Sequence, residues 1–341
     1  MKKILRYILA GILIISQNEN VLSQPTSIVQ KRIISFYNCE NFYDTIDQKN
    51  IIDEEFTPNS TKAYNSRLFQ LKRQQIAKTI FELGKQEEQD GISLMGLVEI
   101  ENKIVLEALV KDPLIQKYHY QIIHFDSKDY RGIDVALLYH PEHFKPYQYK
   151  PISISIKNHQ TDFPTRDILY VKGQLDQEWI HILVNHWPSR RGGSRDSEKR
   201  RFWASEVARN FIDSLQNSDR GAKILMMGDF NDNPSDASLL NIPLKNPFYE
   251  LFKKGYGSLA FNDQWNLFDQ ILMSESLFAP ENTLSYYKSI IYNKNNRAEL
   301  HGRYRGYPKR TWSGDQYNAG YSDHFPVSII LKLKMAENPL K

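Results

Sequence analysis

The stretch "MMGDFNDNPSD", residues 226–236, follows directly on an apolar run that begins at Ile224. Within five residues after Gly228 come two acids and two amides: Asp229, Asn231, Asp232 and Asn233. Asp, Asn, Gly and Pro are common turn residues, so a plain turn is one interpretation. Carboxylates and carboxamides at the end of a buried strand also suit a site for a cation and a phosphate. The ends of the other apolar runs decide between the two.

Apolar runs of strand length recur along the 341 residues, and helical patterns lie between some of them. Strands are predicted at residues 33–37, 92–98, 120–125, 134–139, 167–175, 179–185, 223–228, 268–273 and 326–333. Residues 66–84 and 197–215 carry apolar side chains at helical spacing, and Gly84 is predicted to cap the first helix at its C-terminus. No repeat or low-complexity linker divides the chain after residue 31. We therefore expect one α/β domain over residues 31–333, with sheets covered by helices.

Polar side chains able to bind a cation or a phosphate stand at the ends of six of these runs. They are Asn38, Glu40 and Asn41; Glu99 and Glu101; Asn185 and His186; Asp229 and Asn231; Asp269; and Asp323 with His324. We expect these strand ends to share one rim. Carboxylate and amide oxygens are the ligands that a hard cation such as Mg²⁺ prefers. The sequence has no HExxH or CxxC pattern, which disfavours zinc as the metal.

Two histidines in this set could move a proton near neutral pH. His186 and His324 are the candidates for acid or base, with Asp126 and Asp269 as carboxylates that could orient them. A single histidine at a strand end is more often a structural residue, so each one alone is weak support.

Four short motifs occur in a telling order along the chain: "NCEN" at 38–41, "LVEIEN" at 97–102, "GDFND" at 228–232 and "SDH" at 322–324. Together they resemble the endonuclease/exonuclease/phosphatase superfamily, which includes DNase I-like nucleases, exonuclease III-like repair enzymes, sphingomyelinases and inositol polyphosphate phosphatases. The resemblance extends over the predicted domain. It implies a DNase I-like four-layer sandwich in which helices flank two mixed β-sheets. It also implies hydrolysis of a phosphoester with Mg²⁺ as the metal ion. Mn²⁺ and Ca²⁺ are the alternative ions.

The resemblance implies roles for the acidic positions. Asn38, Glu40, Glu99 and Asp323 match positions near the metal. Glu40 stands where repair-type members carry Asp, so its role as a ligand is less certain than that of Glu99. Asp269 matches the carboxylate that orients the last histidine.

The remaining matches concern the reacting phosphate. Asp229 and Asn231 match the residue that handles the attacking water and the amide that contacts the phosphate. His324 matches the histidine on the phosphate. His186 matches a histidine at the scissile phosphate where repair-type members carry Tyr, which favours the DNase I-like or phosphodiesterase branch. Asp126 matches loosely the carboxylate that pairs with His186.

Two basic clusters bear on the substrate. One, residues 190–201, follows His186 closely, and the other, residues 303–312, alternates cations with aromatic side chains. Such alternation suits a nucleic-acid track, although a solvated helix face explains the first cluster equally well. The predicted substrate-binding residues are Arg131, Arg190 and Arg191. The favoured hypothesis is a nuclease. The alternative enzymes are a sphingomyelinase-like phosphodiesterase with a membrane loop at 246–261 and a small-molecule or inositol phosphatase. A third alternative is a family member that binds its ligand without hydrolysing it.

The N-terminus has the pattern of a signal peptide over residues 1–23. Basic residues precede an apolar core at 8–15 that is too short to span a bilayer, and an uncleaved anchor is the alternative. We therefore expect an exported protein, periplasmic or secreted, with no stable membrane span after cleavage, and a monomer. Cys39 is the single cysteine, so no internal disulfide can form. Its apolar neighbours favour a buried structural thiol over a nucleophile.

Overall fold

A computed structural model describes residues 29–89, 91–154, 164–190, 194–279 and 284–334. The predicted signal peptide lies outside these residues. Two mixed sheets form the centre of the molecule. The six-stranded sheet has the order β12 (Leu284–Ile291), β15 (Val327–Lys334), β1 (Val29–Phe42), β2 (Leu94–Ile100), β4 (Asp134–Tyr139), β3 (Gln121–His124). The five-stranded sheet has the order β11 (Asp269–Met273), β8 (Ile224–Asp229), β7 (Glu178–His186), β6 (Ile168–Leu175), β5 (Phe144–Ile152).

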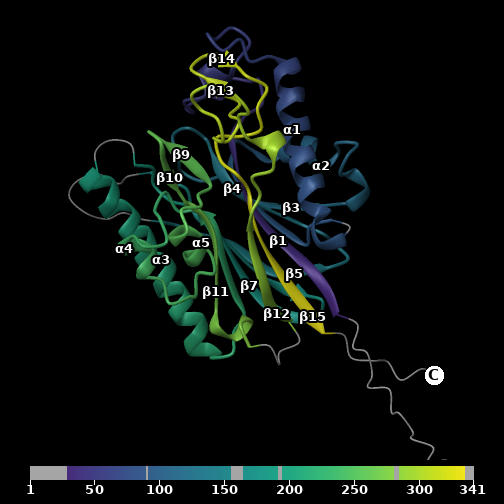
Figure 1. The fold of residues 1–341 in the computed structure, drawn as a ribbon, viewed down its shortest axis with the longest axis vertical. Helices are drawn as coiled ribbons and strands as arrows, with labels where there is room; N and C mark the ends of the chain where they lie inside the picture. Colours follow the sequence, from purple (N-terminus) through teal and green to yellow (C-terminus); the bar gives the residue numbers. More distant parts are fainter. Residues whose placement is uncertain (1–28, 90, 155–163, 191–193, 280–283, 335–341) are drawn as a thin grey trace, which may run out of the picture.

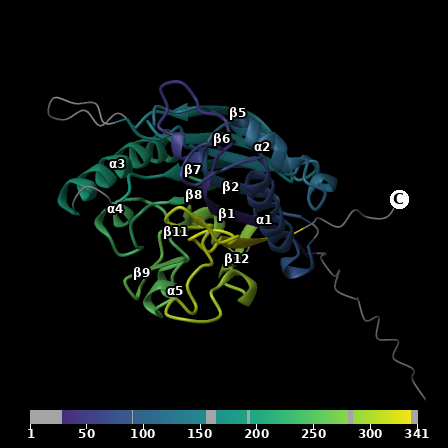
Figure 2. The same cartoon turned by 90° about the horizontal axis from the view of Figure 1, so that it is seen from above.

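Helices and two small hairpins complete the fold. The helices are α1 (Ser66–Gly84), α2 (Lys103–Val110), α3 (Ser194–Ser218), α4 (Ala237–Leu240) and α5 (Tyr249–Lys253). The hairpins pair β9 (Leu259–Phe261) with β10 (Gln264–Asn266), and β13 (Trp312–Ser313) with β14 (Gln316–Tyr317). Figure 1 shows α3 on one side of the strands and α1 with α2 on the other, and Figure 2 shows the same order from above.

The four layers follow from the alternation of side chains along buried strands. In β8, Leu225 and Met227 belong to the core between the two sheets, whereas Ile224 and Met226 pack with α3. A strand covered on both faces reads as a continuous apolar run, which is why this run has no polar residue until Asp229. Each such side chain stabilises the fold by about 1.5–3 kcal/mol. The predicted four-layer α/β sandwich with two mixed sheets is confirmed.

The nine predicted strands all exist, with ends that differ by a few residues. The main extension is β1, which begins at Val29 and continues to Phe42. Sequence reasoning missed β5, β12, α2 and the short hairpins. Most of β5 is exposed, and it carries prolines at 146 and 151, so it has no apolar pattern to detect.

Gly84 has a different function from the predicted cap. It is the last residue of α1, and the C-cap is Lys85, whose φ of −91° is not left-handed. A Cβ at position 84 would lie 2.9 Å from the Cα of Gly91. The glycine therefore permits a close approach of two backbone segments rather than a left-handed helix end.

Candidate active site

Strand ends from both sheets meet at one rim, below the β13–β14 hairpin at the top of Figure 1. Because β1 runs parallel to β2 and β7 runs parallel to β8, their C-terminal ends face the same way within each sheet. Within the five-stranded sheet, Asp229 pairs with both His186 and Asp269. Across the sheets, the Asn38 side chain donates to Asp229 at 3.0 Å. The predicted shared rim therefore exists.

Backbone irregularities aim the acidic side chains of this rim. Glu40, Asn41, Glu99 and Asn231 all have left-handed backbone, with φ values of 51°, 58°, 58° and 52°. The pairing of β1 with β2 shifts register after Asn38, and that of β2 with β4 shifts after residue 98. Bulges of this kind re-aim side chains. Left-handed non-glycine residues cost about 1–3 kcal/mol each and concentrate at functional sites.

Asp229 is the centre of the hydrogen-bond network. Its Oδ2 accepts the Asn38 amide, and its Oδ1 accepts the backbone N–H of Asn231 at 2.9 Å. The Asn231 side chain in turn donates to the carbonyl of Trp187 at 3.0 Å. Burial raises the pKa of Asp229 to about 6, against the lowering effect of the His324 cation. The carboxylate is therefore fixed in place and can accept a proton near neutral pH.

His324 and Asp269 form a short buried pair. Nδ1 of His324 lies 2.6 Å from Oδ2 of Asp269, a carboxylate with no exposed surface. Its Nε2 points toward Asp229 Oδ2 at 3.9 Å. Burial alone would lower the pKa of His324, but the Asp269 and Asp229 carboxylates hold it well above the usual value. At neutral pH this ring is a cation with Nε2–H directed into the site.

His186 differs from His324 in charge. It is buried, its Nε2 lies 3.8 Å from Asp229 Oδ2, and its Nδ1 has no hydrogen-bond partner. Burial, reinforced by the nearby Arg166 and Arg131 cations, lowers its pKa well below 6.5. Two histidines therefore flank the Asp229 carboxylate: His186 is neutral and His324 is positively charged.

The prediction that Asp126 orients His186 is wrong. The Asp126 side chain is 86% exposed and lies 3.9 Å from His124. The carboxylate within 4 Å of His186 is Asp229. A histidine–carboxylate partnership needs contact in space, and Asp126 lies beside His124 instead.

A buried ion pair holds the strand end that carries His186. Arg166 donates to the carbonyls of His186 and Trp187 at 3.2 and 2.8 Å, and its Nη1 lies 2.8 Å from Asp129. Sequence reasoning missed both partners. The signal available was "DYRGID", in which Asp129 lies two residues before the predicted substrate-binding Arg131.

An acidic cavity of about 340 Å³ adjoins this network. Glu40, Glu99 and Asp323 line it together with Arg131 and Arg310, among others. Glu99 accepts the backbone N–H of Asn41 at 2.8 Å, and Glu40 accepts that of Thr311 at 2.6 Å. Burial, followed by the nearby Asp323 carboxylate, raises the pKa of Glu40 to about 7.

The donor set of this cavity fits a divalent cation. Glu40, Glu99 and Asp323 contribute three carboxylates to its lining, and the Arg310 cation contacts two of them. Arg310 donates to Asp323 at 2.9 Å, and its Nε lies 3.7 Å from Glu40. Asn38 is not among the residues that line the cavity, and its Oδ1 accepts the backbone N–H of Glu40. Among the described residues of the rim, the group that meets a distance condition for a metal is Asp229, Asp269 and His324, with one ligand atom of each within 4.8 Å of the others.

Arg190 and Arg191 are the predicted substrate-binding residues of the first basic cluster, and the structure describes Arg190. Arg191 lies outside the described residues. Arg190 donates to Asp236 at 2.7 Å and to Asp232 at 3.1 Å, and it stacks on the ring of Phe268. Its charge is therefore largely neutralised by the protein. Arg131, in contrast, lines the acidic cavity.

Asp232, the second acid of the "GDFND" motif, does not face the acidic cavity or solvent. It is buried and lies 2.7 Å from Arg201 Nε, and it accepts the Ser238 hydroxyl at 2.7 Å. The second half of the "GDFND" motif thus anchors the start of α3 rather than a ligand.

A sequence model described as the endonuclease/exonuclease/phosphatase family matches residues 33–333. The chain belongs to this family. It is therefore a phosphoesterase by family, and its substrate is not fixed by membership. No curated protein matches the sequence.

Solved structures of the family have the same fold. A family protein from Bacteroides thetaiotaomicron has 13% identity and a TM-score of 0.57, over 93% of this chain and 100% of that one. A mannosyl-6-phosphatase from the same organism has 12% identity and a TM-score of 0.56, over 88% and 99%. D. rerio TDP2 in complex with a single-strand DNA product has 12% identity and a TM-score of 0.54, over 88% and 98%. At these identities the likeness establishes the fold alone. None of the described helices is both long and apolar enough to cross a membrane.

Proposed function

We propose that the chain is a divalent-metal-dependent phosphodiesterase that hydrolyses nucleic acid, with Mg²⁺ as its ion. Glu40, Glu99 and Asp323 would hold the ion in the acidic cavity, with Asn38 supporting Glu40. A bound cation supplies charge neutralisation at the phosphoryl oxygens.

The protein's own groups divide the remaining work. Asp229, with its pKa near 6, takes the proton of the attacking water, and Asn231 beside it contacts the phosphate. His324, held as a cation by Asp269, donates from Nε2 to a phosphoryl oxygen. His186 is neutral and contributes a ring N–H on the other side of Asp229. Arg131 supplies a fixed positive charge at the edge of the cavity.

An aromatic and basic surface beside His324 carries the assignment to nucleic acid. Trp265 stacks on Phe325, the residue after His324, with ring centroids 6.1 Å apart and an angle of 12°. Tyr307 continues the row from Trp265 at 5.9 Å, and Tyr304 continues it from Tyr307 at 5.5 Å.

This row of rings, called the aromatic surface below, is open to a ligand. Tyr304 is 54% exposed and Trp265 is 37% exposed. The guanidinium of Arg303 lies over the Tyr304 ring, and Arg305 is exposed beside it. Unpaired bases stack on exposed rings at about 1–3 kcal/mol per base, and the arginines would neutralise the backbone phosphates.

The alternatives have less support. The segment 246–261, which could form a membrane loop, instead places Phe248 in the core and packs Leu251 and Phe252 against it. Tyr256 and Phe261 of the segment are exposed, so the support that a sphingomyelinase-like enzyme retains is limited to these two rings. A small-molecule phosphatase needs no aromatic surface at all, so the two readings predict different effects of removing it.

The test compares a long and a minimal substrate. Tyr304→Ala should raise KM for a single-stranded oligonucleotide about tenfold, because one stacked base is lost. Hydrolysis of a minimal aryl phosphodiester should stay unchanged. Tyr147→Ala, which removes an exposed tyrosine on the edge strand β5, is the matched control and should alter neither. Arg303→Ala should flatten the salt dependence of binding by about 0.7 in log–log slope.

Equal hydrolysis of sugar phosphates and oligonucleotides, with Tyr304→Ala silent on both, would assign the enzyme to small phosphoesters. We also propose export to the periplasm or medium, with cleavage near Gln24. N-terminal sequencing of the mature protein that finds Met1 would reject this.

A further inference from the structure

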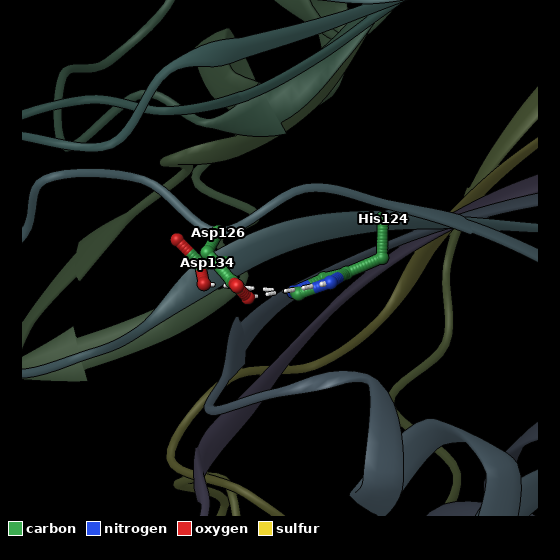
Figure 3. A group of neighbouring side chains, drawn as sticks. All are labelled: His124, Asp126 and Asp134. Carbon is green, nitrogen blue, oxygen red and sulfur yellow. Dashed lines mark ion pairs between the residues drawn. The ribbon is translucent and has the colours of Figure 1, made fainter. Parts of the chain in front are cut away.

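A further group of side chains of metal-ligating types lies at the outer edge of the six-stranded sheet, away from the rim. His124 is the last residue of β3, and Asp134 is the first residue of its neighbour β4. Asp126 lies in the loop between the two strands. Figure 3 shows the His124 ring directed at both carboxylates, which lie side by side. None of these three residues lines the acidic cavity or belongs to the network around Asp229.

One atom of this group lacks the partner that its burial demands. The His124 side chain is 2% exposed, and its Nε2 has no hydrogen-bond partner. Leaving a buried polar atom without a hydrogen-bond partner costs about 1–3 kcal/mol of folding free energy. An unpartnered nitrogen such as this Nε2 therefore needs an explanation, and a bound ligand is one. This Nε2 points at Oδ2 of Asp134, 3.5 Å away.

The spacing of the two atoms suits an ion between them. Zinc lies about 2.0–2.2 Å from imidazole nitrogen and carboxylate oxygen. Two ligands at that range and 3.5 Å apart subtend an angle of roughly 110° at the ion, near the tetrahedral value. A direct hydrogen bond would need a shorter contact.

The carboxylate of Asp134 is prepared to act as a one-atom ligand. Its Oδ1 accepts the backbone N–H of Ser127 at 2.8 Å, which fixes its orientation and leaves Oδ2 toward His124. Second partners of this kind are typical of ligating carboxylates. Asp126 could supply a third ligand: its Oδ1 lies 3.9 Å from Nδ1 of the same ring, and one ligand atom from each of the three residues lies within 4.8 Å of the other two. Being exposed, its side chain can rotate inward at little cost.

We propose that His124, Asp126 and Asp134 bind a divalent ion of the Zn²⁺ class, with water as the fourth ligand. An imidazole in the set favours Zn²⁺ over Mg²⁺ or Ca²⁺, which take oxygen ligands. The motif search missed this site because its ligands are spaced His-x-Asp and then eight residues apart, which is not a zinc-finger or HExxH pattern.

The ion would fasten the loop between β3 and β4 at its base. That loop carries Asp129, which holds Arg166, and Arg131, which lines the acidic cavity. A clamp here stabilises the walls of the active site without entering it. Metal binding, rather than hydrolysis, is therefore the property to measure.

The experiment uses the full protein with Mg²⁺ in excess, so that the hard-ion site is already filled. Zn²⁺ is titrated in, and the metal content after gel filtration and the Tm are recorded. We expect about one tightly held Zn²⁺ per chain and a Tm rise of roughly 5 °C at a hundredfold excess over Kd. Asp126→Asn changes an exposed side chain and should fold normally, yet bind Zn²⁺ at least tenfold more weakly. Asp47→Asn, another exposed aspartate, is the matched control and should bind as the parent does.

Two results would overturn the proposal. One is equal Zn²⁺ content, affinity and Tm shift in the parent and Asp126→Asn. The other is a Tm rise with Ca²⁺ but none with Zn²⁺. Glu99→Gln separates this site from the proposed hydrolysis, because it removes a carboxylate of the acidic cavity and should leave Zn²⁺ binding intact.

Discussion

Replacing Asp269 with Asn tests how the charge of His324 is maintained. Asn keeps the shape of the side chain and an oxygen for Nδ1 of His324, but it removes the negative charge. A hydrogen bond to a charged group contributes about 1.5–3 kcal/mol. The 2.6 Å contact and the complete burial of Asp269 place this pair at the upper end. The pKa of His324 should therefore fall, because the carboxylate that raises it most is gone.

The rate should follow the protonation state. If His324 acts as a cation, a loss of about 3 kcal/mol lowers kcat/KM roughly a hundredfold at pH 8. The sign of the pH effect is fixed by the same reasoning. Because the variant imidazole regains its proton as the pH falls, the gap between variant and parent should narrow toward pH 6. Asp229 remains 3.9 Å away and still favours the cation, so the variant should not be inactive.

Two measurements check this on the same protein. NMR titration of the His324 imidazole gives its pKa directly. A pH–rate profile on a minimal phosphodiester gives the difference in kcat/KM between parent and variant at each pH. Asp47→Asn is a control for an aspartate-to-asparagine change at an exposed position. An unchanged pKa of His324 would refute the electrostatic argument. A rate gap of constant size at every pH would show that Asp269 acts only by positioning the ring.

Three further predictions concern other parts of the molecule. Glu99→Ala should lower the rate of hydrolysis by about a thousandfold and abolish its dependence on Mg²⁺, while thermal unfolding remains cooperative. Turnover close to that of the parent would show that Glu99 is not a metal ligand. Cys39→Ser should keep its activity but lose about 1–3 kcal/mol of unfolding free energy in urea, because Cys39 is fully buried in an apolar cluster and a hydroxyl there would lack a partner. A folded but inactive variant would contradict this. Burial lowers the pKa of His143 to about 4, so the unfolded chain takes up this proton first as the pH falls below 6.5, and His143→Gln should lose about 1–2 kcal/mol less stability between pH 7 and pH 5 than the parent. Parallel stability curves for the two proteins would reject that assignment.

The sequence predicted the sheets well because their strands are buried on both faces. The runs at β2, β4, β7 and β8 are almost continuously apolar, so period and length alone locate them. The edge strand β5 escaped detection because its side chains mostly face solvent. Strand ends are visible in sequence, so the grouping of Asn38, Asp229, Asp269 and His324 at one rim could be foreseen.

The sequence did not predict which charged side chains pair with one another when they are far apart in the chain. Arg190 stands beside His186 in the chain and looks free, yet Asp236, 46 residues away, takes its charge. Asp126 has the spacing of an orienting carboxylate but turns outward. The left-handed conformations of Glu40 and Glu99 arise from bulges that no local preference predicts, since glutamate does not favour them. These features depend on contacts that form only when the sheets pack.

The position of β15 governs when activity can appear during synthesis. This strand is near the C-terminal end of the described chain, yet it lies between β12 and β1 and joins them into one sheet. Ser322 and Asp323 come just before it, while their respective partners Asn38 and Glu40 are made near the beginning. A growing polypeptide on the ribosome therefore lacks both the joining strand and part of the rim until residues 322–334 have emerged. The rim cannot assemble, and hydrolysis cannot begin, before that point in synthesis.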